Sequence, residues 1–122
     1  MRHLTPDQAA AALRRGKPVE QLLECGSHDG ERTVSWLSVA PSGGEFTLTA
    51  HHVYDDGRPD FRDVTEFTPV DEWEGVGEGV EVARCAEPAA ALQAATRHGA
   101  SSDAWVNFSV IGDEYAHARG WS

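Results

Sequence analysis

The sequence predicts an α+β fold in a single domain, residues 1–122, in which an antiparallel β-meander of about four to five strands packs against an N-terminal helix and two C-terminal helices. Three observations support this prediction. A helix-capping pattern opens the chain, alternating apolar residues fill its middle, and helical signals return after residue 87. The chain has 122 residues, of which 40% are hydrophobic, and this is the size and composition of one ordinary globular domain.

The first helix is predicted to follow Thr5. Thr5 is a favoured N-cap, Pro6 suits the first helical position, and Gln8 stands three residues after the cap, as in a capping box. Two arginines near the end of the pattern suit the negative end of the helix dipole, and Gly16 can adopt a left-handed C-cap conformation. We therefore expect this helix to end near Arg15.

Four strand segments follow. Residues 18–25 precede an Asp-Gly turn, and residues 32–40 are apolar on both faces, which indicates an interior strand. Residues 45–54 show the clearest alternation, and residues 61–70 are expected to form a less regular strand that follows a short acidic turn. The residues of the third strand expected on its core face are Phe46, Leu48, Ala50, His52 and Tyr54.

The C-terminal third is predicted to contain one more strand and two helices. Residues 80–85 read as a short strand, and Pro88 opens an alanine-rich helix that should end near His98. A second helix is expected after Asn107, because Phe108, Ile111 and Tyr115 recur at helical spacing. The large apolar residues predicted to form the core are Trp36, Leu37, Phe46, Leu48, Phe67, Leu92 and Ile111.

Composition bears on location and on covalent chemistry. No apolar run approaches the roughly 20 residues that a membrane span needs, so we expect no membrane association. Charged residues interrupt the N-terminal segment, which therefore lacks the apolar core of a secretory signal, and we expect a cytoplasmic protein. Cys25 and Cys85 lie 60 residues apart without zinc-ligand spacing, and free thiols are expected.

Negative charge is the unusual feature of the composition. The chain carries a net charge of −10, and residues 55–87 hold eleven acidic residues against three arginines. Such a concentration repels nucleic acid and attracts cationic partners, although acidity of this size also keeps proteins soluble. We expect one exposed acidic surface that binds a basic protein, with Trp73 as its apolar anchor. Its residues are Asp55, Asp56, Asp60, Asp63, Asp71, Glu72, Trp73 and Glu74.

Candidate catalytic and metal-binding residues are few. His51 and His52 precede two aspartates, but adjacent strand residues point to opposite faces, so no metal site and no cofactor are expected. We expect His52 to be hydrogen-bonded on the core face and His51 to lie among exposed threonines. Asp113 and His117 are four residues apart on a predicted helix, which fits either a surface pair or an acid and a base.

Two segments, HHVYDDGRPDFRDVTEFTPV and WVNFSVIGDEYAHAR, resemble recurring pieces of small, acidic, uncharacterised proteins from high-GC bacteria, and nine arginines against one lysine fit that source. In size and acidity the chain is also similar to immunity proteins of bacterial toxin systems. This resemblance implies a small cytoplasmic inhibitor that covers the active site of a basic toxin, and it implies no site residues.

The function expected from the sequence is therefore that of a non-enzymatic acidic binding protein, which neutralises or regulates a basic protein partner. The alternative is a small-molecule-binding or enzymatic α+β domain with a cleft between the sheet and the helices, near His52 and Tyr54. That alternative predicts a deep, partly apolar pocket and a histidine whose pKa is shifted.

Overall fold

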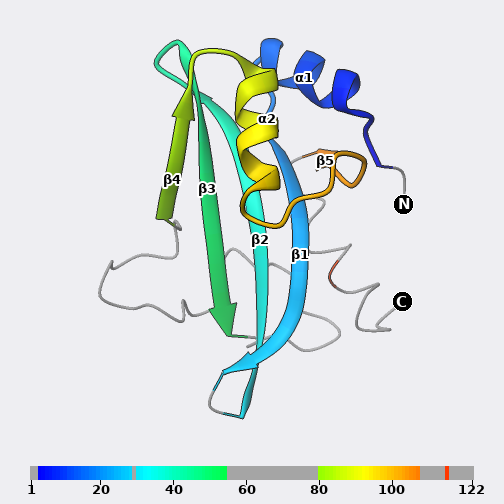
Figure 1. Ribbon diagram of the computed structural model, residues 1–122, viewed down its shortest axis with the longest axis vertical. Helices are drawn as coiled ribbons and strands as arrows, with labels where there is room; N and C mark the ends of the chain where they lie inside the picture. The colour runs from blue at the N-terminus through cyan, green and yellow to red at the C-terminus, as the bar shows by residue number, and fades with distance from the viewer. Residues whose placement is uncertain (1–2, 29, 55–79, 108–114, 116–122) are drawn as a thin grey trace.

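The computed structural model describes residues 3–28, 30–54, 80–107 and 115. Over these residues the chain forms one antiparallel sheet, with strand order β4-β3-β2-β1-β5, and two helices (Figure 1). The elements in chain order are α1 (Pro6–Arg14), β1 (Val19–His28), β2 (Glu31–Ser42), β3 (Glu45–Tyr54), β4 (Val80–Cys85), α2 (Pro88–Thr96) and β5 (Val106–Asn107).

Helix α1 begins as the sequence predicts. The backbone N–H of Thr5 donates to Oε1 of Gln8 at 2.9 Å, and the backbone N–H of Gln8 donates to Oγ1 of Thr5 at 3.2 Å. This reciprocal capping box satisfies two backbone donors that the first turn of a helix leaves free. At the other end Gly16 has a φ of 84°, a left-handed conformation that glycine adopts without a steric penalty.

A two-residue turn sets the register of the central hairpin. Gly43 and Gly44 have φ values of 59° and 85°, and positive φ at both positions is the requirement of the tight turn that suits the twist of antiparallel strands. The turn places Glu45 opposite Ser42. The same ladder then places Leu48 opposite Val39, so these two apolar side chains share one face of the sheet.

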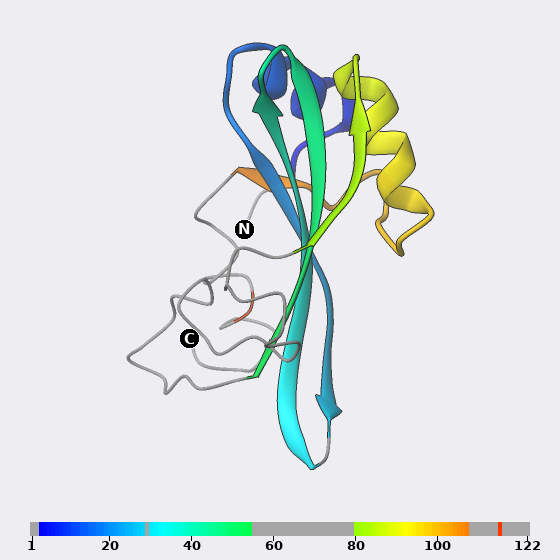
Figure 2. The ribbon, with the colours of Figure 1, turned by 90° about the vertical axis from the view of Figure 1, so that its left-hand side faces the viewer.

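Both helices pack on that face. Figure 2 shows α1 and α2 on the same side of the sheet, beside the end that carries the β2–β3 turn. Small alanine side chains on both helices allow close approach to the strands and contribute to one buried cluster. Its buried members are Ala9, Ala10, Ala12, Leu13, Val19, Leu37, Val39, Leu48, Ala91, Leu92, Ala95 and Trp105.

A second buried cluster lies on the opposite face of the sheet. Side chains alternate along β2, so Val34 and Trp36 point away from the helices while Leu37 and Val39 point toward them. Val34 and Trp36 pack with Val53 of β3 and with Tyr115, and all four are at most 3% exposed. The prediction of an interior strand covered on both faces is therefore confirmed for β2.

Residues 101–107, which include β5, contact the start of the described chain and strand β1. β5 pairs with Val19 and Glu20 of β1, and the backbone N–H of Leu4 donates to the carbonyl of Trp105 at 2.7 Å. The buried side chain of Gln21 donates to the carbonyl of Ser101 at 2.8 Å and accepts from its N–H at 2.6 Å. These bonds satisfy the buried amide and fix the approach to β5.

The structure confirms α+β architecture and corrects the order of the strands. Residues 46–50 of β3 pair with β4, so the immediate neighbour of β3 there is not the predicted strand 61–70, which lies outside the described residues. β5 was not predicted. Of the residues predicted to form a second C-terminal helix after Asn107, only Tyr115 is described; its backbone is helical, and the helix stays a prediction. Neither helix of the described part is long and apolar enough to cross a membrane.

The predicted core is confirmed at four positions. Trp36, Leu37, Leu48 and Leu92 are at most 8% exposed. Phe46 is partly buried and packs against the helix-side cluster. The two remaining core predictions, Phe67 and Ile111, lie outside the described residues.

Replacing Leu48 by Ala should lower the free energy of unfolding by about 2–5 kcal/mol, because its fully buried side chain leaves a cavity between β3 and the helices. Urea unfolding followed by circular dichroism measures the change. The control is Val80→Ala, since Val80 is 46% exposed and should shift stability by less than about 1 kcal/mol. Equal shifts for the two variants would contradict the packing described for β3.

Candidate functional site

The predicted acidic surface belongs to one long connection between neighbouring strands. β3 ends at Tyr54, β4 begins at Val80, and the two strands are hydrogen-bonded partners. All eight predicted partner-binding residues fall in the intervening 55–79, which lies outside the described residues. The sequence places nine acidic residues and two arginines there, a net charge of −7, which leaves −3 for the rest of the chain.

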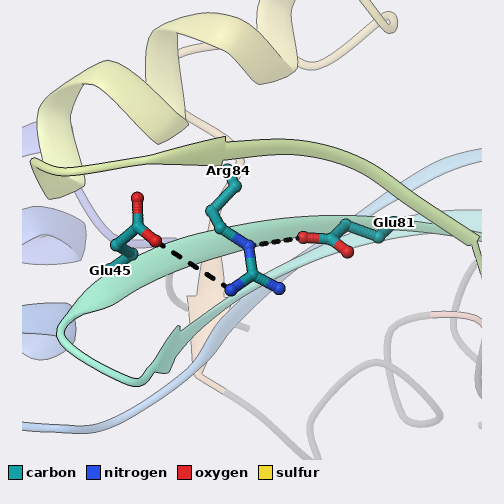
Figure 3. Close-up of polar contacts among 3 residues, drawn as sticks. All are labelled: Glu45, Glu81 and Arg84. Carbon is teal, nitrogen blue, oxygen red and sulfur yellow. Dashed lines mark hydrogen bonds and ion pairs between the residues drawn. The ribbon is translucent and has the colours of Figure 1, made fainter.

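Acidic side chains of the sheet are partly neutralised within it. Nε of Arg84 on β4 donates to Glu81 at 2.8 Å, and its Nη1 lies 3.9 Å from Oε1 of Glu45 (Figure 3). The hydrogen bond to Glu81 and its negative charge raise the pKa of Arg84. These groups are exposed, so the pairs contribute little to stability. Arg84 therefore offsets one of the two negative charges of Glu45 and Glu81.

The most unusual titratable residue is His51 on β3. Its Nε2 lies 3.0 Å from Oγ of Ser38, and its ring stacks on Trp36 with centroids 4.5 Å apart and an interplanar angle of 4°. Trp36 and Ser38 belong to β2, where Trp36 is the direct cross-strand partner of His51. The three side chains therefore form one group on the face of the sheet away from the helices.

Burial controls the charge of His51. Desolvation lowers its pKa from 6.5 to about 4, so the imidazole is neutral at physiological pH. Within the described part of the chain, Nδ1 of His51 and Nε1 of Trp36 are buried and have no hydrogen-bond partner. Each such group costs about 1–3 kcal/mol of stability.

The contact between Ser38 and His51 has the separation of a nucleophile and its base, but it lacks the remaining features of a catalytic pair. No carboxylate of the described residues orients Nδ1, which is the atom that the third member of a triad holds. A pKa of about 4 also makes His51 a weak base at neutral pH. We therefore interpret this pair as structural.

The two histidines exchange the environments that were predicted for them. His51 was expected among exposed threonines and is instead half-buried and hydrogen-bonded, while His52, expected in the core, is exposed. His51 is half-buried because it stacks on Trp36 on the face away from the helices, and His52 is exposed because the helices do not extend over it. His52 shares a face with Leu48 and Ala50, but the helix-side cluster ends at Ala50. The two rings point to opposite faces, as the alternation predicts.

A cavity of about 300 Å³ opens between α1 and α2. His52 and Tyr54 do not contribute to it, so this cavity is not the cleft that the alternative function placed beside those two residues. The sequence analysis did not predict this cavity. The alanine-rich composition of the two helices is the one local feature of the sequence that relates to it. The lining residues are Pro6, Asp7, Ala10, Arg14, Ala89, Leu92, Gln93, Thr96, Ser102 and Trp105.

The other chemical candidates are only partly within the described residues. Cys85 is a free, half-buried thiol at the end of β4, as expected. Cys25 lies in β1, and its side chain is outside the described part. Asp113 and His117 also lie outside it. Among the described side chains, no three histidine, cysteine or acidic residues gather in a way that could hold a metal ion.

A scan against models of protein families, a search of curated proteins and a search of solved structures each found no match for this chain. Function is therefore inferred from the chain's own residues. Three features stand out: the charge of residues 55–79, the buried group around His51, and the cavity between the helices.

His51 should make the folded state sensitive to mild acid. Its folded pKa of about 4 lies below the unfolded value of 6.5, so the unfolded chain gains the proton first and stability falls as the pH drops through this window. Between about pH 7 and 5 the wild type should lose about 2 kcal/mol more than His51→Gln, measured by urea unfolding. His52→Gln is the control and should keep the wild-type loss. The same loss in His51→Gln would contradict this assignment.

Proposed function

We propose that this protein is a non-enzymatic binding protein that neutralises or regulates a basic protein partner through residues 55–79, called here the acidic segment. The observation that carries the proposal is the position of the charge. A net charge of −7 is concentrated in 25 residues, while the remaining 97 residues carry −3. The charged groups of a cationic partner are the chemical complement of such a segment.

The length of the acidic segment supports this proposal. β3 and β4 are antiparallel neighbours, and strands in that relation are commonly joined by about two to five residues. Here 25 residues stand between Tyr54 and Val80. Connections between elements are where binding residues are often carried. The pairing of β4 with β3 needs only a few connecting residues, so we infer a further role for residues 55–79.

A purely solubilising role fits the charge distribution less well. Charges that serve solubility work when both signs are spread over the whole surface. In the sheet they are mixed in this way, since Arg84 lies between Glu45 and Glu81. In the acidic segment one sign dominates, and like charges placed close together repel one another, which costs stability. A sequence is expected to keep this repulsion when its negative charge serves to attract a cationic partner.

Within the acidic segment we assign distinct roles to charge and to Trp73. Its acidic residues would steer a cationic protein into place, and Trp73, which stands between Glu72 and Glu74, would supply the apolar contact that holds it. Aromatic residues surrounded by polar ones are the usual anchors of interfaces. An inhibitor of the immunity-protein kind, directed at a basic toxin domain, matches this chemistry.

Salt and substitution together test the proposal. A cationic protein retained in stoichiometric amount by the full chain, from its native host at low salt, should associate about tenfold more slowly when the salt is raised from about 50 to 500 mM. Asp55→Asn with Asp60→Asn should slow association further. Trp73→Ala should instead accelerate dissociation by about tenfold or more, because it removes a buried anchor. Stopped-flow fluorescence measures both rates.

The matched control changes two charges elsewhere. Glu31→Gln with Glu87→Gln removes the same net charge from two exposed positions outside the acidic segment and should leave association nearly unchanged. If the control slowed association as much as the double aspartate variant, the partner would respond to total charge alone. An association rate indifferent to Asp55 and Asp60 in a variant that still folds would defeat the proposal.

A further inference from the structure

The cavity between α1 and α2 is lined by two residues of opposite charge. Asp7 and Arg14 both line it, and they stand seven residues apart on α1, which is two helical turns on one face. At a rise of 1.5 Å per residue, their backbones are separated by about 10 Å along the helix. Within the described residues neither side chain forms a hydrogen bond or an ion pair, so both charges are available to a ligand.

The cavity also has an apolar wall, whose residues are held in place by the rest of the fold. Ala10 of α1, Leu92 of α2 and Trp105 line it, and each is at most 8% exposed. Trp105 is held in place because its carbonyl accepts the backbone N–H of Leu4 at 2.7 Å. The capping box fixes the start of α1. Because these supports exist without a ligand, little ordering would oppose binding.

The remaining wall offers an amide. Gln93 of α2 lines the cavity, is exposed, and has no side-chain hydrogen bond within the described part of the chain. A glutamine side chain presents a carbonyl acceptor and an N–H donor, which are the complement of one peptide group. The cavity, which is called the groove from here on, thus combines an anion, a cation, an amide and an apolar floor.

We propose that this groove binds a short peptide with free termini, about three small residues long, with its ammonium group at Asp7 and its carboxylate at Arg14. An extended chain spans at most about 3.5 Å per residue, so three residues match the separation of the Asp7 and Arg14 backbones along α1. A volume of about 300 Å³ lies at the small end of the range for ligand pockets, which favours a tripeptide of small residues. Gln93 binds a peptide group of the ligand.

Isothermal titration of the full chain with tri-alanine tests this site. We expect a dissociation constant of about 1 mM or lower. Acetylating the amino terminus or amidating the carboxyl terminus of the probe should each weaken binding about tenfold, because each removes one charge from the ligand. Ala10→Leu, which fills the groove, should abolish binding, and circular dichroism shows whether that variant is folded.

A matched pair of arginine variants separates the site from general charge effects. Arg14→Gln should weaken tri-alanine binding about tenfold and should make it insensitive to amidation, whereas Arg15→Gln, which lies outside the groove, should change neither. The proposal is overturned if tri-alanine at about 10 mM releases no binding heat, if the blocked peptides bind as tightly as the free one, or if the two arginine variants behave alike.

Discussion

Strand β2 carries large apolar side chains on both of its faces, and the described structure is arranged to cover both. Leu37 and Val39 require cover on one side, and Val34 and Trp36 require it on the other. Burying side chains of this size stabilises the fold by about 1.5–3 kcal/mol each. The β2–β3 turn sets the register that places Leu48 beside Val39, and the alanine-rich helices then close over that face. Chain segments distant in sequence are brought together by this requirement.

The same constraint accounts for the environment of His51. As the cross-strand partner of Trp36, it lies on the face that the second cluster covers, so its ring is desolvated and stacks on the indole. The cost is a neutral imidazole with one nitrogen unpartnered within the described residues. The two clusters stabilise the described sheet, and most of the net charge of the chain lies in residues 55–79. This concentration of charge supports the recognition role proposed for the acidic segment.

Sequence patterns predicted the features that neighbouring residues determine. They missed the features that depend on how distant elements pack together. The capping residues after Thr5 and the alternation of Glu45–Tyr54 gave correct elements, because both signals act within a few residues. The exposure of His52 depends on how far the helices extend over one face of the sheet, and the burial of His51 depends on its packing beside Trp36 on the other face. β5 has two residues, which is too short to show a period. The groove depends on how α1 and α2 pack together, and neither helix sequence specifies that alone.

Hydrogen exchange provides the most direct test of the central claim, that the acidic segment recognises a cationic protein while the sheet and helices support it. The exchange of backbone amides should be compared for the full chain alone and in complex with the retained partner. The account predicts that binding slows exchange within residues 55–79 and leaves the β2–β3 ladder unchanged. Slowed exchange confined to the helices or the sheet, with residues 55–79 unaltered, would contradict it.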